Sequence, residues 1–579
     1  MRISIAQINS TIADFEGNSK KILACAQRAH DEQKADMVLF PELAVCGFPP
    51  MDLMEDGSFA ELNARTLKDL EKELPRDIAV GLGFIKENPY SQGKNYVNVY
   101  GVILDRKLVF EQIKTLIPAS DIFDEARYFE PAREWNVFEY SGERIGFGIS
   151  EDVWRGIGGP GVSYSKDPVG ILSELNITML CVPSASPFTT RGYRVRHVLA
   201  EQIVIRENIP LVYANAAGAN DEVIFSGRSF VVSPYKKAGK TKDCFLAACA
   251  GAFTEDLVVW DSIADQKNKT LPGMENTTAL EENDPYKAGL SRYELDMLEK
   301  ALTEGIRNYM KKCGFTRVHL GLSGGIDSAL VAYLAVKAAG PENVVCINMP
   351  SCFSSQGSKD DSKELAGNLG CRYEVIPIDS IYNPAISALD DVFKKLPFDA
   401  AEENIQARIR GILLMAYSNK FKSMLLAGGN KSEIAMGYCT LYGDTNGALA
   451  PIGDVLKTEV IALCKLINLH SVNNSGKAII PQAIIDKPPS AELRPNQKDE
   501  DSLPPYSVLD QILKLHLYGK LSPGEIAKRG FDRELVNGII RTVIRNEFKR
   551  RQLPPVLKVT PRTFGIGRRM PLTRVIYEI

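Results

Sequence analysis

The chain has 579 residues, which at roughly 150 residues per domain leaves room for several domains. Hydrophobic residues make up 45% and charged residues 24% of the sequence, a composition typical of globular proteins that excludes a disordered chain. The net charge of −3 gives no reason to expect a nucleic-acid partner. No apolar run approaches the roughly 20 residues of a membrane helix, and the first residues lack a signal-peptide pattern. We therefore expect a cytoplasmic protein without a membrane or nucleic-acid partner.

The cysteines and histidines do not form a recognisable metal or disulfide pattern. The 11 cysteines are odd in number and scattered, without a CxxC pair, which argues against a disulfide framework and a zinc site. The 5 histidines lie far from one another and from any obvious nucleophile. Chemistry based on a catalytic His is therefore disfavoured.

Short β-rich runs alternate with segments of helical spacing in the first 260 or so residues. The predicted strands cover 37–40, 78–82, 97–103 and 145–149, and the predicted helices cover 20–32 and 61–74. Between residues 264 and 288 the sequence has no periodicity, as is typical of a linker. We therefore predict a first domain over 1–262, a linker over 263–290 and a second domain over 291–579.

The second domain repeats the order strand, turn, helix. Strands are predicted at 318–322, 344–349 and 373–378, and helices at 296–312, 329–339 and 359–369. This repetition predicts a doubly wound parallel sheet with helices on both faces. Residues 486–506 contain five prolines among charged residues, which predicts a mobile surface loop.

A glycine-containing turn, Leu322-Ser323-Gly324-Gly325-Ile326-Asp327-Ser328, follows the first of these strands and opens a helix. Backbone N–H groups at such a turn can approach a phosphate closely, and the helix N-terminus adds a partial positive charge. A carboxylate at Asp327 would repel phosphate unless a divalent cation lay between them, so the turn implies Mg²⁺. The lysine of a Walker loop is absent. The alternative is a tight turn whose glycines serve packing alone.

The same turn resembles the phosphate loop of the ATP pyrophosphatases, and later segments narrow the resemblance. Met349-Pro350-Ser351, 403–411, 429–433, 437–444, 451–458 and 488–495 follow in the order and spacing of the NAD synthetase family. The resemblance extends from about residue 291 to the C-terminus and implies an adenine nucleotide alpha hydrolase-like fold. It also implies that ATP adenylates the nicotinate carboxylate of deamido-NAD and that ammonia then displaces AMP to give NAD.

The family pattern assigns roles to individual positions. The matching ATP-binding residues are Gly321, Leu322, Ser323, Gly324, Gly325, Ile326, Asp327, Ser328, Gly428 and Lys457. The matching deamido-NAD-binding residues are Asn404, Arg408, Glu433 and Lys558, and the matching Mg²⁺ ligands are Asp327 and Glu433. Arg408 could instead lie on a solvated helix face, and Ser490 could be either a phosphate cap or a plain loop serine.

Segments of the first domain resemble the carbon–nitrogen hydrolase (nitrilase) superfamily, and in particular the glutaminase domain fused to NAD synthetases. The resemblance rests on Phe40-Pro41-Glu42, on 113–118 with Lys114, on 123–129 with Glu125, and on 145–154 with Ser150. It implies an α-β-β-α sandwich in which Glu42 is the general base and Lys114 stabilises the oxyanion. Glu125 matches a position at the glutamine site that orients the lysine or shares its proton. Ser186 matches a position that contacts glutamine.

The nucleophile position departs from the family, because Ser150 stands where the family has Cys. A hydroxyl is far less acidic than a thiol of pKa about 8.5, so the same carboxylate base should activate it poorly. Cys46 and Cys181 lie in apolar surroundings and are predicted to be packed cysteines. Three explanations stay open: an engineered substitution that traps glutamine, a natural loss of glutaminase activity, or a working serine enzyme. Because the other motif residues are present, we favour an engineered substitution with impaired glutaminase activity.

The combined resemblance implies a ligase that makes NAD with ammonia taken from glutamine and passed internally to the second domain. Families of this kind usually form homo-oligomers, so a homo-oligomer is expected. Two rivals remain: an ATP-pyrophosphatase amidotransferase with another acceptor, and a glutamine-binding regulatory domain fused to an ammonia-using synthetase.

Overall fold

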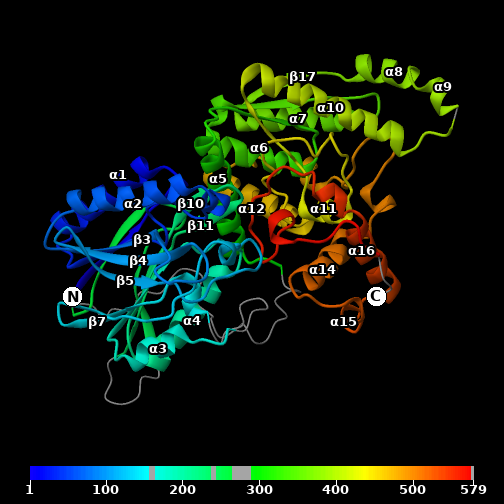
Figure 1. Ribbon diagram of the computed structural model, residues 1–579. Coiled ribbons are helices and arrows are strands. Elements are labelled where there is room, and N and C mark those ends of the chain that lie inside the picture. The colour runs from blue at the N-terminus through cyan, green and yellow to red at the C-terminus, as the bar shows by residue number, and fades with distance from the viewer. Residues whose placement is uncertain (155–163, 236–242, 264–288, 395, 576–579) are drawn as a thin grey trace. The chain divides into compact units, whose positions relative to one another are not determined.

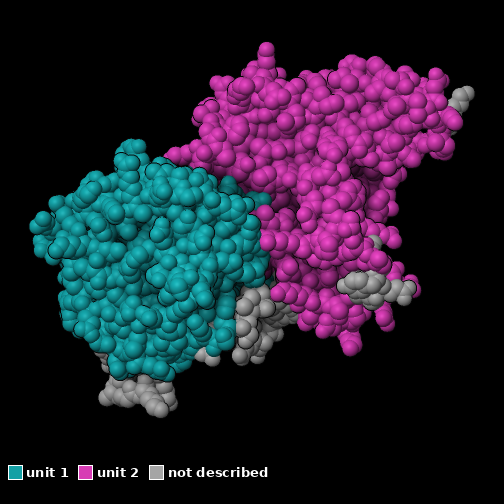
Figure 2. Space-filling model, in the orientation of Figure 1, with its two compact units in different colours: residues 1–279 teal, residues 280–579 magenta. Residues whose placement is uncertain are grey.

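The computed structural model describes residues 1–154, 164–235, 243–263, 289–394 and 396–575. The chain divides into two compact units, 1–279 and 280–579, coloured separately in Figure 2. Most of the predicted linker, residues 264–288, lies outside the described residues, so the predicted boundaries at 262 and 291 stay predictions.

Unit 1 is built on two mixed β-sheets (Figure 1). The first sheet has the spatial order β14 (Asp256–Asp261), β1 (Arg2–Gln7), β2 (Met37–Leu39), β3 (Ala79–Glu87), β4 (Tyr96–Leu104) and β5 (Lys107–Ile113). The second has the order β13 (Cys244–Cys249), β12 (Phe230–Pro234), β9 (Leu211–Asn215), β8 (Met179–Ser184), β7 (Glu143–Phe147) and β6 (Phe138–Tyr140). A hairpin of β10 (Ala217–Asn220) and β11 (Val223–Ser226) stands apart from both sheets.

Three apolar layers hold unit 1 together. Ile5 of β1 and Tyr100 of β4 pack against Phe147 of β7, which places the central core between the two sheets. Helices α1 (Phe15–Asp31) and α2 (Gly57–Glu73) pack with the outer face of the first sheet. Helices α3 (Pro168–Glu174) and α4 (Gly192–Glu207) pack with the second sheet. The layers are therefore α-β-β-α, as the sequence predicted.

Unit 2 contains a parallel sheet in the order β17 (Arg372–Val375), β16 (Val344–Asn348), β15 (Val318–Gly321) and β18 (Met424–Leu426). Val345 and Ile347 of β16 pack with α8 (Asp379–Ser387) and α10 (Ala400–Phe421). Cys346 points to the opposite face, where its sulfur lies 3.6 Å from that of Cys371, just after α7 (Gln356–Leu369). Helices on both faces confirm the predicted doubly wound sheet.

Further helices surround this sheet and form a C-terminal bundle. They are α5 (Arg292–Lys312), α6 (Ile326–Ala339), α9 (Asp390–Phe393), α11 (Lys431–Met436), α12 (Lys457–Ser475), α13 (Gln482–Asp486), α14 (Tyr506–Leu517), α15 (Pro523–Ala527), α16 (Arg533–Arg545) and α17 (Glu547–Arg550). Short 3-10 turns occur at η1 (Met51–Glu55), η2 (Glu125–Arg127), η3 (Ser150–Val153), η5 (Pro341–Asn343), η6 (Asp499–Asp501) and η7 (Gly565–Gly567). Apolar side chains of α11, α14, α15 and α16 share one core.

The predicted helices begin several residues later than the observed ones. Asp14 caps α1 and Asp56 caps α2, each accepting a hydrogen bond from a backbone N–H of the first turn. Ser291 and Glu294 form a reciprocal capping box at the start of α5. These polar first turns lie outside the apolar period, so a prediction from periodicity alone starts too late.

Among the described residues, no helix is both long and apolar enough to cross a membrane.

A buried histidine gives unit 1 a testable response to acid. His197 of α4 is 2% exposed, its ring stacks on Phe230 at a centroid distance of 4.0 Å, and neither ring nitrogen has a hydrogen-bond partner among the described residues. Burial, helped by the charges of Arg228 and Arg196, lowers the pKa of His197 to about 3. The unfolded chain, with the ordinary pKa of about 6.5, therefore binds a proton that the folded chain does not bind, and stability falls as the pH drops below 6.5.

We predict that lowering the pH from 7 to 5 costs the folded protein about 2 kcal/mol through His197 alone. Urea unfolding at both pH values, compared between the unsubstituted chain and His197→Leu, measures this contribution. The variant should lose less stability on acidification, because a neutral side chain cannot take up the proton. An equal loss in both proteins would show that His197 does not titrate as the packing requires.

Candidate active sites

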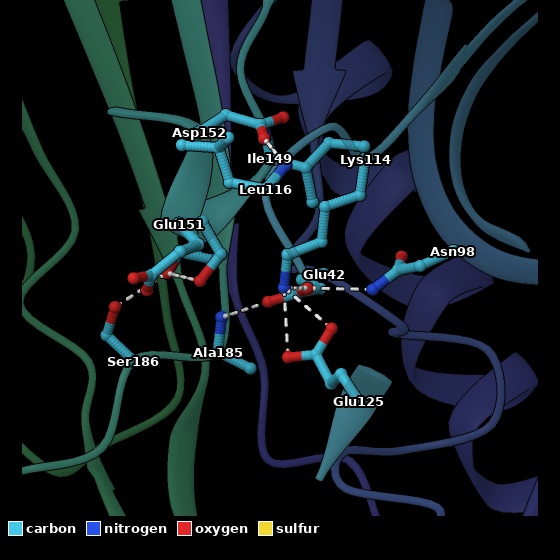
Figure 3. A network of polar contacts seen from close by, with 12 residues as sticks. Glu42, Asn98, Lys114, Leu116, Glu125, Ile149, Glu151, Asp152, Ala185 and Ser186 are labelled. Atoms are coloured by element: carbon cyan, nitrogen blue, oxygen red, sulfur yellow. Dashed lines mark hydrogen bonds and ion pairs between the residues drawn. The ribbon is translucent and has the colours of Figure 1, made fainter. Parts of the chain in front are cut away.

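A buried lysine lies between two carboxylates in unit 1 (Figure 3). Lys114 follows the end of β5, and its side chain is 1% exposed. Its Nζ donates to Oε1 of Glu42 at 2.7 Å and to both carboxylate oxygens of Glu125 at 2.8 and 3.0 Å. The three residues that the sequence assigned to one site therefore do meet, although Glu42 and Lys114 are 72 positions apart.

The electrostatics of this cluster favour a charged lysine. Burial acts to lower the pKa of Lys114, but the charges of Glu125 and Glu42 hold it above its ordinary value. Burial raises the pKa of Glu125 to about 7 against the opposing charge of Lys114. Glu125 can therefore exchange a proton near neutral pH, while Lys114 keeps its positive charge.

Two further groups fix Glu42 in place (Figure 3). The side-chain amide of Asn98 donates to Oε1 at 2.8 Å, and the backbone N–H of Ala185 donates to Oε2 at 3.2 Å. Asn98 lies on β4 and Ala185 follows β8, so each sheet supplies one contact to the carboxylate. The sequence motifs did not single out Asn98, although a buried Asn within an otherwise apolar strand is a usable signal.

Ser150 follows β7 and is the first residue of η3. Its φ of +49° is in the left-handed region, which a side chain other than glycine seldom adopts. Its Oγ lies 3.1 Å from Oγ of Ser184, the residue next to Ala185. The nucleophile position and the Glu42 carboxylate therefore contact adjacent residues of one segment.

Three hydroxyls continue from Ser150 in a chain. Oγ of Ser184 lies 2.7 Å from Oγ of Ser186, which is 2.7 Å from the hydroxyl of Tyr213. Tyr213 donates back to Ser184 at 2.9 Å. The predicted glutamine contact, Ser186, is thus part of the same polar cluster as Ser150.

Asp152 connects the two segments that carry Lys114 and Ser150, and the sequence analysis missed it. Its carboxylate accepts backbone hydrogen bonds from Leu116 at 2.6 Å and from Ile149 at 3.0 Å (Figure 3). It also accepts one from the backbone of Thr115 at 3.0 Å. These donors directly flank Lys114 and Ser150. An acidic residue two positions after a nucleophile, in a segment that ends a buried strand, is the signal that could have revealed it.

Cys46 and Cys181 are packed, as predicted. Both are buried, and burial raises the pKa of each thiol above its ordinary value. A thiol that resists ionisation is a poor nucleophile. Neither cysteine therefore offers a substitute for the missing thiol at position 150.

Unit 2 contains a cavity of about 320 Å³ at the carboxyl ends of its strands. The turn after β15 and the segment after β18 both line it. These two strands are neighbours in the sheet although β16 and β17 lie between them in the sequence. The strand order therefore reverses between them, which is where doubly wound sheets bind ligands. The predicted ATP-binding residues that line the cavity are Gly321, Leu322, Ser323, Gly324, Gly325, Ile326, Asp327, Ser328, Gly428 and Lys457.

The turn itself is held by its own hydroxyls and by close packing. Oγ of Ser323 lies 3.1 Å from Oγ of Ser328, which donates to the carbonyl of Gly325 at 3.0 Å. Gly324 has φ +83°, and a Cβ at this position would lie 2.4 Å from the carbonyl oxygen of Ser358. The backbone of α7 therefore leaves room for glycine only.

A second buried lysine lies between two carboxylates at the edge of this cavity. Nζ of Lys457 donates to Oδ2 of Asp327 and, at 3.3 Å, to Oε1 of Glu433. The side chain of Asn430 donates to Oδ1 of Asp327 at 2.9 Å. Burial, followed by the charge of Asp327, raises the pKa of Glu433 to about 8, while the two carboxylates hold the pKa of Lys457 above its ordinary value.

The remaining predicted residues, those for deamido-NAD binding, are less closely associated with the cavity. Thr440, which lines the cavity, donates to Asn404 at 2.6 Å. Arg408 is exposed and donates to the carbonyl of Leu441 at 3.2 Å. Lys558 is buried and donates to the carbonyl of Thr560 at 2.7 Å. Arg408 and Lys558 are not among the cavity-lining residues of the described chain.

The predicted mobile loop, 486–506, contributes to the cavity wall. Ser490 lines the cavity, and its hydroxyl donates to the carbonyl of Gln497 at 2.6 Å. Glu492 accepts hydrogen bonds from the hydroxyls of Ser355 and Ser358, at 2.9 and 2.6 Å, at the start of α7. The loop is thus attached to the helix next to the phosphate loop, a contact that the proline-rich sequence did not indicate.

Comparisons with known proteins identify the family of each unit. The carbon-nitrogen hydrolase family model matches residues 2–238, and the NAD synthase family model matches residues 298–554. Glutamine-dependent NAD(+) synthetase from Synechocystis sp. is 41% identical over 579 residues, covering 99% of this chain and 99% of that protein. The chain belongs to the glutamine-dependent NAD(+) synthetases. The family's enzyme from Aquifex aeolicus is 37% identical, covering 100% of both chains.

A solved structure of the same family supports the fold. The glutamine-dependent NAD+ synthetase from Acinetobacter baumannii, in complex with adenosine diphosphate, matches with a TM-score of 0.71 and 33% identity over 99% of this chain and 98% of that chain. The family forms C–N bonds as a ligase, so the chain is an enzyme of that class.

The turn around Gly324 supports a direct test. We predict that Gly324→Ala weakens ATP binding at least tenfold and lowers the free energy of unfolding by about 1–3 kcal/mol, because the added Cβ meets backbone and φ is positive. Calorimetric titration with ATP and urea unfolding measure the two effects.

Gly357→Ala is the matched control, because Gly357 precedes Ser358 on α7 and a Cβ there meets nothing within 4 Å. This control should bind ATP normally. Normal ATP binding by Gly324→Ala would contradict the assigned phosphate loop.

Proposed function

We propose that residues 291–579 convert deamido-NAD to NAD with ATP and ammonia. The observation that carries this proposal is the Asp327–Lys457–Glu433 cluster beside the turn from Ser323 to Ser328. A cluster of two carboxylates and an ammonium fits a site where triphosphate charge must be held and redistributed. The family relationship supplies the substrates.

The reaction has two steps whose atoms balance. A carboxylate oxygen of deamido-NAD attacks the α-phosphorus of ATP, and pyrophosphate leaves with the electron pair of the broken P–O bond. Ammonia then attacks the activated carbonyl carbon, AMP leaves, and the nitrogen loses its extra proton. The backbone N–H groups of the phosphate loop orient the triphosphate, and Lys457 stabilises the negative charge that moves onto pyrophosphate.

The site also fits Mg²⁺. Asp327 and Glu433 share a single ammonium, and burial, followed by the charge of Asp327, raises the pKa of Glu433. A hard divalent cation prefers such oxygen ligands, and when bound it would neutralise triphosphate charge. In this proposal Asp327 and Glu433 hold the ion.

The deamido-NAD contacts rest on the family pattern more than on geometry. Asn404 accepts a hydrogen bond from Thr440, which lines the cavity, and Arg408 donates to the carbonyl of Leu441, the residue after Thr440. These contacts support a role in holding the dinucleotide. Lys558 already donates a hydrogen bond to the carbonyl of Thr560 in its own segment, so the proposal that it contacts deamido-NAD has the weakest support.

A homo-oligomer remains part of the proposal, because α10 exposes the apolar Ile412 and Met415. The substrates and the free cysteines favour the cytoplasm.

For unit 1 we propose a glutamine site of the carbon–nitrogen hydrolase type. Glu42 would take the proton of the nucleophile, which attacks the side-chain amide carbon of glutamine. The Lys114 ammonium would stabilise the resulting oxyanion, and Glu125 would hold Lys114 and buffer its proton. Ammonia would leave with a proton returned from Glu42, and water would then release glutamate.

Ser150 makes glutamine hydrolysis the least efficient step of this cycle. Its hydroxyl is hydrogen-bonded to the hydroxyl of Ser184. The carboxylate oxygens of Glu42 accept hydrogen bonds from Lys114, Asn98 and Ala185. An alcohol needs a stronger base than a thiol does, so we propose that glutamine binds but is hydrolysed slowly. An engineered substitution explains a serine among otherwise intact residues better than natural loss or a serine enzyme does.

NAD formation from deamido-NAD, ATP and Mg²⁺, run in parallel with ammonium and with glutamine, tests the proposal. Product with ammonium and little with glutamine is expected. Failure with ammonium, in folded protein, would reject the synthetase assignment. Preference for a different carboxylate acceptor would support the rival ATP-pyrophosphatase amidotransferase instead.

We further predict that Ser150→Cys increases glutamine-driven NAD formation by roughly 100-fold or more and leaves the ammonium-driven rate unchanged. The thiol ionises more readily beside the same base, whereas the second site is untouched. Cys46→Ser serves as a control and should change neither rate. If Ser150→Cys failed to raise the glutamine-driven rate while glutamine still bound, unit 1 would be a glutamine-binding regulatory domain.

A further inference from the structure

Asp510 does not line the cavity. It accepts hydrogen bonds from α11, which carries Glu433, and from α12, which carries Lys457. It is on α14 and is 2% exposed. Its Oδ1 accepts from the hydroxyl of Ser432 at 2.5 Å, and its Oδ2 accepts from the backbone N–H and the hydroxyl of Thr458 at 2.9 and 2.7 Å. One carboxylate therefore joins the first turn of α11 to the first turn of α12.

Ser432 closes this connection into a ring. The backbone N–H of Lys457 donates to Oγ of Ser432 at 2.9 Å, while the same Oγ donates its only proton to Asp510. A hydroxyl has one proton and two lone pairs, so giving the proton to Asp510 turns a lone pair towards Lys457. The directions of the two hydroxyl hydrogen bonds, from Ser432 and Thr458, thus depend on an acceptor-only group at position 510.

The ring residues are the immediate neighbours of the charged pair. Ser432 precedes Glu433 on α11, and Thr458 follows Lys457 on α12. Lys457 reaches both Glu433 and Asp327 through its ammonium. A change in the separation of α11 and α12 therefore changes the distance between Glu433 and Lys457, and with it the contact to the phosphate loop.

We propose that Asp510 is a positioning residue of the synthetase site. It sets the separation of α11 and α12 so that Lys457 lies between Asp327 and Glu433. This inference deepens the proposed function and rests on it for the identity of the reaction. Buried groups that orient the residues of a charged site typically change affinity or rate by 10–100-fold when they are lost.

A purely structural cap of α12 is the alternative role. Asp510 bonds to a backbone N–H in the first turn of α12, and loss of a helix cap lowers stability. A cap would leave the turnover number of the folded protein unchanged. A positioning role would lower the turnover number and the affinity for nucleotide even where the protein stays folded.

The test is Asp510→Asn, which keeps the shape but presents an NH₂ donor to groups that are themselves donors. We expect ammonium-driven kcat to fall 10–100-fold, with KM for deamido-NAD changed less than threefold. Calorimetric titration with ADP and Mg²⁺ should show at least tenfold weaker binding. Ser432→Ala removes two hydrogen bonds of the ring and Thr458→Val removes one. Both should give smaller losses than Asp510→Asn, and they replace Asp510→Asn if that variant does not fold.

The double variant Asp510→Asn/Ser432→Ala should lose no more activity than the worse single variant, because both changes break one ring. Glu547→Gln is the control: Glu547 is buried in the same unit and bonds to Arg550 and Arg568, so it should lose stability but keep kcat. Unchanged kcat in folded Asp510→Asn, or multiplying losses in the double variant, would overturn the proposal. If the chain with Asp510 unchanged made no NAD with ammonium, the proposed function would fail, and the ADP titration would still decide the role of Asp510.

Discussion

Each unit of this protein is organised around a buried ammonium group held by two carboxylates. Lys114 lies between Glu42 and Glu125, and Lys457 lies between Asp327 and Glu433. Removing such charges from water costs several kcal/mol per ion, and a single unpaired partner would be more costly still. The partners of each lysine come from distant parts of the chain, so the charges constrain how the strands and helices of that unit can pack.

The sheets meet this constraint by placing polar residues where strands end. Glu42 lies three residues after β2, Lys114 directly after β5, and Ser150 three residues after β7. In unit 2, Asp327 opens the helix after β15, and Asn430 caps the helix after β18. Apolar strands bury the sheets, and the first residues beyond them are free to carry charge. Asp152 and Asp510 then use hydrogen bonds to neighbouring segments to fix the spacing of these residues.

The sequence predicts much of this arrangement because local patterns carry it. The repeated strand–turn–helix pattern indicated the doubly wound sheet of unit 2. The family resemblance implied the α-β-β-α sandwich of unit 1 and the members of the two lysine clusters. Asp510 and Glu492 were not predictable in this way, because their hydrogen bonds join segments that are far apart in sequence and carry no spacing signal. Asn430 could have been predicted as a helix cap, since an Asn followed three residues later by Glu433 is a capping-box pattern. The loop at 486–506 has a polar, proline-rich composition, which does not reveal its bonds to α7.

The two lysine clusters should serve separate chemistry, and ammonium-driven NAD formation in two variants tests this most directly. We expect Lys457→Met to lower the ammonium-driven rate at least 100-fold, because no ammonium group would then stabilise the negative charge on the leaving pyrophosphate. Folded Lys114→Met should keep that rate within about twofold, because added ammonium makes glutamine hydrolysis unnecessary. Retention of the rate in Lys457→Met, or its loss in folded Lys114→Met, would contradict the account.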